Sequence, residues 1–197
     1  MTKTYNTHLI TYLCLFFSLI SYAQTKNEKE ERINKEDFPI NALEVTDHIP
    51  AHAKRLRFYK EMDGEKQSFE AKFKLNKLRY SVEFNTNGEL EDIEVKTKFG
   101  GISKPISDNI LCYLKNNYGK HRIIKIQKQF LFNNTLSPKD FFKTIINNNT
   151  DLKPRFEIIA EVKEGKTRTI KEFTFDSKGD FVEARIVNPN SYEHVLY

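Results

Sequence analysis

The sequence contains no tryptophan, and its 197 residues include only two cysteines, Cys14 and Cys112. Cys14 lies in an N-terminal apolar segment that we expect to be removed, so one cysteine remains and no intramolecular disulfide can form. The sequence also lacks a Gly-x-Ser-x-Gly nucleophile motif, a phosphate-binding loop and a dinucleotide-binding fingerprint. We therefore expect neither catalytic residues nor a cofactor.

Cys112 itself lies beside Leu111, Tyr113 and Leu114 in a segment with helical spacing of apolar residues. A reactive thiol would need a nearby base, and no histidine is close to it in the sequence. We expect a thiol buried in the core, where apolar surroundings keep it protonated and inert.

Histidines that could bind a metal are few in the sequence. His48 and His52 are four residues apart, but Pro50 between them would break the helix that could place both on one face. The segment from Asp176 to Asp180 has the look of a calcium loop but lacks the required length and terminal Glu. We expect surface histidines, a hairpin turn and no metal site.

The N-terminus has the layout of a secretory signal peptide, residues 1–23, cleaved before Gln24. Lys3 lies in a polar segment, an apolar run extends from Leu9 to Ile20, and small residues precede the cleavage point. A membrane anchor is the alternative, but that run is shorter than the roughly 20 residues that span a bilayer. We expect a periplasmic or secreted protein with no transmembrane segment.

Charge gives little indication of a nucleic-acid partner. Without Lys3, 31 of the 32 basic side chains remain against 27 acidic ones. Opposite signs alternate along the chain, whereas nucleic-acid-binding proteins concentrate basic residues on one face. We expect no nucleic acid as partner.

The mature chain divides into a highly charged leader, residues 24–36, and a folded part. The leader has almost no apolar residues, which predicts disorder. Order is expected to begin at Asp37, as a helix cap, followed by Pro39 in the first turn.

From residue 53 to residue 98, apolar and charged residues alternate with a period of two, which predicts four antiparallel strands. Turns are expected at Asn76–Lys77 and at Asn87–Gly88. Helical spacing follows from Ser103, and a short helix follows Ser137. The apolar strand face requires a helical cover, and the charged face, including Glu91 and Asp92, is expected to be solvated.

The end of the chain repeats the pattern of the first half. In both copies a Phe precedes a turn Gly by four residues, and an aliphatic residue follows that Gly by seven; the members are Phe84, Gly88 and Val95, then Phe175, Gly179 and Ile186. Internal repeats set architecture. We predict an α+β fold of two tandem modules, residues 37–101 and 102–190, each a helix with a four-stranded antiparallel sheet, packed as one body.

Between about Phe38 and Val187, this pattern resembles the PepSY-like domain family, also described as β-lactamase-inhibitor-protein-like. The shared features are a proline at each helix start and a hydrophobic-x-hydrophobic-(x)3-Gly turn: Pro39 and Pro105, then Val82-Phe84-Gly88 and Phe173-Phe175-Gly179. The resemblance implies a small secreted or periplasmic protein of Bacteroidetes that binds or inhibits extracytoplasmic enzymes. It implies no catalytic residues, and the absence of Trp argues against the Trp-rich interface of inhibitor relatives.

We predict non-catalytic binding to an unidentified extracytoplasmic protein, with inhibition or regulation as its possible effect. Aromatic and Arg side chains suit interfaces, and the expected contact residues are Arg55, Arg57, Tyr59, Lys72 and Lys74. An ordinary solvated sheet exterior is the alternative for each of them. Two other functions remain open: a carrier of a small apolar ligand between helix and sheet, and a hydrolase whose residues converge only in the fold.

Overall fold

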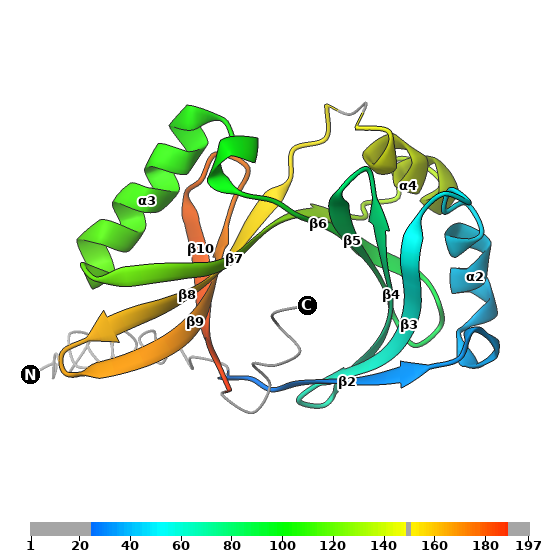
Figure 1. Ribbon diagram of the computed structural model, residues 1–197, viewed down its shortest axis with the longest axis horizontal. Coiled ribbons are helices and arrows are strands. Elements are labelled where there is room, and N and C mark those ends of the chain that lie inside the picture. The colour runs from blue at the N-terminus through cyan, green and yellow to red at the C-terminus, as the bar shows by residue number, and fades with distance from the viewer. Residues whose placement is uncertain (1–24, 149–150, 189–197) are drawn as a thin grey trace, which may run out of the picture.

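The described residues form an α+β fold in which three α-helices pack on the outer face of a ten-stranded mixed sheet (Figure 1). The computed structural model describes residues 25–148 and 151–188. The predicted signal peptide, residues 1–23, lies outside the described residues. No helix within the described ranges is long and apolar enough to cross a membrane.

The strands follow the order β1-β10-β9-β8-β7-β6-β5-β4-β3-β2. Neighbours from β2 to β10 are antiparallel, and β1 runs parallel to β10. Their bounds are Thr25–Lys26 (β1), Glu28–Ile33 (β2), Lys54–Asp63 (β3), Lys66–Leu75 (β4), Leu78–Phe84 (β5), Leu90–Lys96 (β6), His121–Leu131 (β7), Arg155–Glu164 (β8), Thr167–Phe175 (β9) and Phe181–Val187 (β10).

One continuous segment joins the two ends of this sheet. Strands β1 and β2 are separated only by Asn27, yet β1 pairs with β10 and β2 pairs with β3. The sheet therefore curls into a nearly closed barrel. The prediction of a disordered leader over residues 24–36 was wrong from Thr25 onward, because its charged side chains find partners on distant strands.

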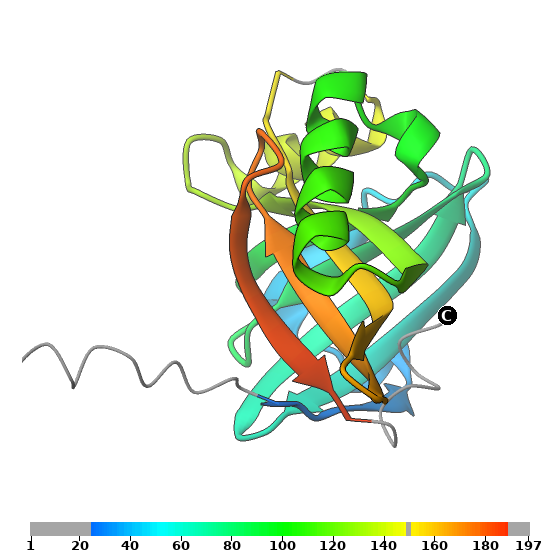
Figure 2. The same ribbon diagram turned by 90° about the vertical axis from the view of Figure 1, so that its left-hand side faces the viewer.

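The helices lie outside the barrel, as Figures 1 and 2 show. Their bounds are Ile40–Thr46 (α2), Lys104–Tyr118 (α3) and Pro138–Ile146 (α4), with short 3-10 helices at Lys35–Asp37 and Phe99–Gly101. The predicted start of α4 is confirmed, since Ser137 Oγ accepts a hydrogen bond from the Asp140 amide at 3.1 Å. The prediction that Asp37 caps the first helix was wrong: α2 begins after Pro39 without a side-chain cap.

Two apolar cores fill the space between the helices and the outer face of the sheet. Side chains of α2 and α4, including Val45 and Phe142, pack with Phe84 and other residues of β3–β6. Side chains of α3, including Leu114, pack with Phe173 and other residues of β7–β10. The predicted helical cover is confirmed, and the fully buried rings of Phe84, Phe142 and Phe173 contribute to the apolar stabilisation of the fold.

The same contact joins a hairpin turn to a helix in each half of the chain. Asn41 Nδ2 donates to the carbonyl oxygen of Asn87 at 3.0 Å, and Asn109 Nδ2 donates to that of Lys178 at 3.1 Å. Each accepting residue precedes a turn glycine with positive φ, 78° at Gly88 and 85° at the second turn. The repeat seen in the sequence is thus matched by two equivalent turn-to-helix contacts.

Cys112 lies on the exposed side of α3. Its Sγ accepts a hydrogen bond from Asn116 Nδ2 at 3.3 Å, one turn later on the same helix. The prediction of a buried thiol was wrong. Ile110 and Leu114 carry the buried face of this helix, and Cys112 points away from both.

Candidate functional site: a basic mouth above an acidic lumen

The curl of the sheet turns its charged face inward, so that this face lines the lumen of the barrel. Phe58, Ile93 and Ile158 belong to the outer cores, and the residues that alternate with them point to the inside. Asp92 on this inner face is only 6% exposed. The prediction that this face is solvated was wrong, because strand alternation defines two faces without saying which becomes concave.

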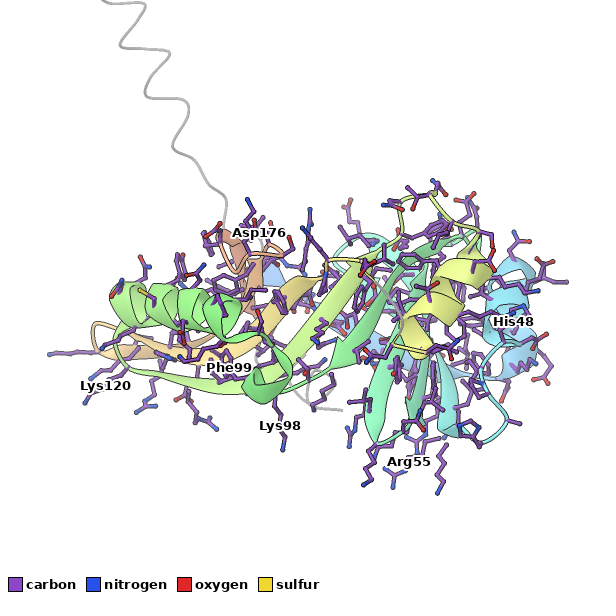
Figure 3. The ribbon with its side chains drawn as sticks, turned by 90° about the horizontal axis from the view of Figure 1, so that it is seen from above. His48, Arg55, Lys98, Phe99, Lys120 and Asp176 are labelled. Carbon is purple, nitrogen blue, oxygen red and sulfur yellow. The ribbon has the colours of Figure 1, made fainter. Side chains whose placement is uncertain are left out.

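At one mouth of the barrel, basic side chains surround a pocket of about 120 Å³. We call these residues the basic mouth: Arg55, Arg57, Lys74, Arg79, Lys96 and Lys125. The five predicted contact residues all line this pocket, since Tyr59 and Lys72 also contribute to it. In Figure 3, Arg55 and Lys98 lie at the same edge of the barrel, opposite the edge that carries Asp176.

Two local irregularities shape the mouth. The register of β3 against β4 shifts between Lys54 and Arg57, and Arg55 within this bulge has a positive φ of 61°. At the other side, Asn76 and Lys77 both have positive φ and form the predicted two-residue turn. These features bend the strand ends and direct their charged side chains to one opening.

Like charges face one another across the strands of the mouth. Lys74 is paired in register with Lys54 on one side and with Arg79 on the other. Burial, together with the charges of Lys125 and Arg79, lowers the pKa of Lys96. Like-charged residues directly opposite each other destabilise a sheet, so this arrangement favours an anionic group at the mouth.

The charge of Lys72 is neutralised inside the barrel. Its Nζ lies 2.5 Å from Glu30 Oε1 and 2.8 Å from Glu70 Oε2, and 5.2 Å from the centre of the Tyr59 ring. Burial alone would lower the pKa of Lys72, but the two carboxylates raise it well above its usual value. Lys72 thus anchors the floor of the pocket.

Below the mouth, the lumen is rich in carboxylates from seven of the ten strands: Glu28, Glu30, Glu61, Glu70, Glu83, Asp92, Glu94, Glu157 and Glu172. Lys26 and Arg185 bind Glu172 at 2.8 and 2.7 Å. Burial would raise the pKa of Glu172, but these two cations lower it to about 2. A small apolar cluster around Ile159 and Val187 fills the lumen beside them.

For other carboxylates of the lumen, nearby cations do not outweigh burial and like charge. Burial and the charges of Glu28 and Glu70 raise the pKa of Glu61 to about 9. Burial and neighbouring carboxylates likewise raise the pKa of Glu83, Asp92 and Glu157. Buried like charges are stable only when protons or cations neutralise them.

Within the described residues, the groups whose side chains could hold a metal ion contain only carboxylates. They are Glu28, Glu30 and Glu61; Glu61, Glu70 and Glu83; and Glu83, Asp92 and Glu94. This clustering depends on strand register and on the closure of the barrel, so no local sequence pattern predicts it. His48, on the turn after α2, belongs to none of these groups.

The apolar-ligand alternative finds no support in the geometry. The spaces between helices and sheet are occupied by the side chains of the two cores. The groove beside α2 and α4 is lined mainly by polar residues, among them Asn41, Glu44 and His48. A carrier of apolar molecules needs a largely apolar cavity.

The comparisons with known proteins identify the fold. No protein-family model and no curated protein matches the sequence. A candidate periplasmic protein from Bacteroides eggerthii is similar in structure, with a TM-score of 0.52 at 9% identity over 79% of this chain and 94% of that one. A DUF2874 family protein from Bacteroides ovatus has a TM-score of 0.50 at 10% identity, over 76% and 87%. A BLIP-like protein from Bacteroides fragilis has a TM-score of 0.47 at 11% identity, over 76% and 86%.

At these identities the likeness shows a shared fold. The predicted resemblance is confirmed to that extent, as a structural match to DUF2874 proteins of Bacteroides. The PepSY-like name is carried by none of these three proteins and stays a prediction.

The basic mouth contains three residues that the sequence analysis did not select, Arg79, Lys96 and Lys125. A signal for the first was present: a two-residue turn at Asn76–Lys77 places Lys74 opposite Arg79. Lys125 comes from β7, across the junction of the two halves of the sheet, and no local pattern indicates its position.

Proposed function

We propose that the chain is a non-catalytic binding protein of the periplasm or the secreted fraction. Its basic mouth contacts an acidic segment of an extracytoplasmic protein partner. The observation that carries this proposal is the gathering of basic side chains around one pocket, with Lys74 and Arg79 directly opposite each other on β4 and β5. An anionic partner would relieve their repulsion on binding.

The shape of the site supports a protein segment as ligand. The pocket of about 120 Å³ is small beside the roughly 300–1,000 Å³ of typical drug-sized ligand sites, so one side chain fits it. A second depression, lined by Lys77, Lys98 and neighbouring residues, adjoins it and shares Arg79 and Lys96 with it. A loop of the partner could insert one acidic side chain into the pocket, while the residues on either side of it contact the adjoining depression.

We further propose that residues 37–101 and 102–190 are related modules. The equivalent contacts of Asn41 and Asn109 with the two glycine turns support this interpretation. Strands β6 and β7 pair directly, so the two modules share one sheet. The signal-peptide layout and the fold shared with a candidate periplasmic protein support the proposed location.

A defined anionic probe tests the mouth directly. We expect the protein to bind a fluorescein-labelled deca-glutamate peptide in fluorescence anisotropy, more weakly as salt rises. Arg57→Glu combined with Lys74→Glu should raise the dissociation constant at least tenfold. Lys115→Glu combined with Lys139→Glu makes the same charge change on exposed helix positions and should have little effect. Equal weakening by both pairs would contradict a specific mouth site.

The partner itself requires capture from the native envelope fraction. Wild-type protein and the two double variants serve as bait, and bound proteins are identified by mass spectrometry. A genuine partner should be retained by the Lys115/Lys139 variant and lost with the Arg57/Lys74 variant. A partner captured equally by all three baits would place the interface elsewhere.

A further inference from the structure

Three carboxylates from neighbouring strands meet inside the lumen. Glu83 on β5 is paired in register with Asp92 on β6, and Glu94 follows two residues later on the same face. No salt bridge connects any of the three to a Lys or Arg among the described residues. Like charges opposite each other in a sheet are unfavourable, so this group requires a neutralising partner.

The spacing of the three side chains suits a single ion. One oxygen atom from each of Glu83, Asp92 and Glu94 lies within 4.8 Å of the other two. Calcium binds oxygen ligands at about 2.3–2.6 Å, so two of its ligands can be up to about 5 Å apart. The three oxygens can therefore coordinate one ion without a change in backbone structure.

A second observation points to a missing ligand. Asp92 is 6% exposed, and its Oδ1 is buried and accepts no hydrogen bond within the described part of the chain. Its other oxygen, Oδ2, accepts a hydrogen bond from Gln129 Nε2 at 3.1 Å. Buried carboxylate oxygens seldom remain unsatisfied, and Oδ1 therefore lacks a partner that a cation would supply.

Neighbouring side chains hold the group in place. Gln129 donates to Asp92, and Gln127 donates to Glu94 from the same strand, β7. Such contacts orient metal-binding carboxylates in other proteins. The ligands thus come from β5 and β6, and their orientation comes from β7.

The other two carboxylate groups differ because lysines are close to them. Lys26 contacts Glu28 at 2.9 Å, and Lys72 contacts both Glu30 and Glu70. These two cations provide positive charge to the groups that contain Glu28, Glu30 and Glu70. The group on β5 and β6 forms no direct ion pair with a lysine or arginine of the described residues. Lys66 attracts Glu83 and Asp92, but its direct ion pair is with Glu91.

We propose that Glu83, Asp92 and Glu94 form a binding site for a hard divalent cation, with Ca²⁺ as the preferred ion. The ligands are all carboxylates, which favours Ca²⁺ over ions that prefer imidazole or thiolate. Mg²⁺ requires near-ideal octahedral geometry and retains several waters, so it binds more weakly in this confined group. When Ca²⁺ is bound, the three carboxylates coordinate one ion and no longer repel one another across β5 and β6.

The test uses the whole protein, stripped of metal with EDTA and dialysed at pH 7.5. Calorimetric titration with CaCl₂ should give one site per chain, and thermal melts should show a rise in Tm with Ca²⁺ and a smaller rise with Mg²⁺. Asp92→Asn should weaken Ca²⁺ binding at least tenfold. In the absence of metal it should melt at the same or a higher temperature than the wild type, because it removes one of three repelling charges.

Glu91→Gln is the matched control, since it removes the same charge from the adjacent residue of β6. Glu91 pairs with Lys66 at 2.7 Å and belongs to no carboxylate group. The Ca²⁺ affinity of Glu91→Gln should fall much less than that of Asp92→Asn, although Lys66, freed from Glu91, is also attracted to Glu83 and Asp92. Absence of any heat or Tm change with CaCl₂ in the wild type would overturn the proposal. An unchanged affinity in Asp92→Asn would do the same, since it would place the ion elsewhere.

Discussion

Arg185 Nη1 on β10 lies 2.9 Å from Asp63 Oδ2 on β3. These two strands are not neighbours in the sheet; only the segment of β1 and β2 lies between them. The same guanidinium binds Glu172 through Nη2 at 2.7 Å. One side chain thus connects both ends of the sheet across the seam where the barrel closes.

Arg185→Ala is expected to lower the free energy of unfolding by about 3 kcal/mol, because breaking a buried ion pair leaves its partner uncompensated. Urea unfolding followed by circular dichroism would measure this loss. Arg122→Ala is the control: its side chain is 66% exposed and pairs with Glu161 at the surface. Such pairs contribute about 0–1 kcal/mol, so equal losses in the two variants would argue against a special role for the seam.

Gly88→Ala should destabilise the protein by about 2–4 kcal/mol, through positive-φ strain and through overpacking. A Cβ atom here would lie 2.8 Å from Pro39 Cβ and 3.0 Å from the Ala42 amide nitrogen. Gly179→Ala should behave alike, since its Cβ would lie 2.6 Å from the Ile106 carbonyl oxygen. Valine at either glycine should cost more.

Gly64→Ala separates the two causes in the same thermal melts. Gly64 has a φ of 62°, but a Cβ atom there would have no neighbour within 4 Å. The loss of stability in Gly64→Ala should come from backbone strain alone and amount to about 1 kcal/mol. If all three variants melted alike, the packing of the turns on α2 and α3 would contribute nothing measurable.

Acid should weaken the seam through Glu172. Its pKa in the folded protein is about 2, below the ordinary value of 4.5. Its contribution is therefore complete above pH 4.5 and is lost as the pH falls to about 2; it amounts to about 3 kcal/mol at most, from about 1.4 kcal/mol for each pKa unit. Glu172→Gln should be less stable at pH 7 and should lose less stability between pH 5 and pH 2. A parallel pH dependence in both proteins would contradict this role.

Cys112→Ala should change the free energy of unfolding by less than about 0.5 kcal/mol, as is usual for exposed positions. The exposed thiol should react with a maleimide dye in the native protein almost as fast as in urea. Slow labelling of the native protein would show instead that the Cys112 thiol is buried, as the helical spacing of its neighbours had suggested. Binding of the deca-glutamate peptide should be unchanged, because α3 contributes nothing to the basic mouth.

Part of the candidate site could be predicted from the local sequence. Arg57, Tyr59 and their neighbours on β3 and β4 were selected because they alternate with apolar residues, and the structure places them around one pocket. The alternation could not show that the pocket lies at the mouth of a barrel. The alternation also could not show that Lys72 forms an ion pair with Glu30, because Glu30 lies in the segment predicted to be a disordered leader.

Local sequence patterns specify the strands with their two-residue alternation, the turn at Asn76–Lys77, the helix capped by Ser137 and the helical cover of the apolar face. Each of these depends on residues within a few positions of one another. The tertiary structure decided the rest. Residues 28–33 carry almost no apolar side chains, so their order depends on pairing with β3 and on contacts such as the ion pair of Glu30 with the distant Lys72. That closure, and the curl it completes, turn a charged sheet face into a buried carboxylate lumen with a basic mouth.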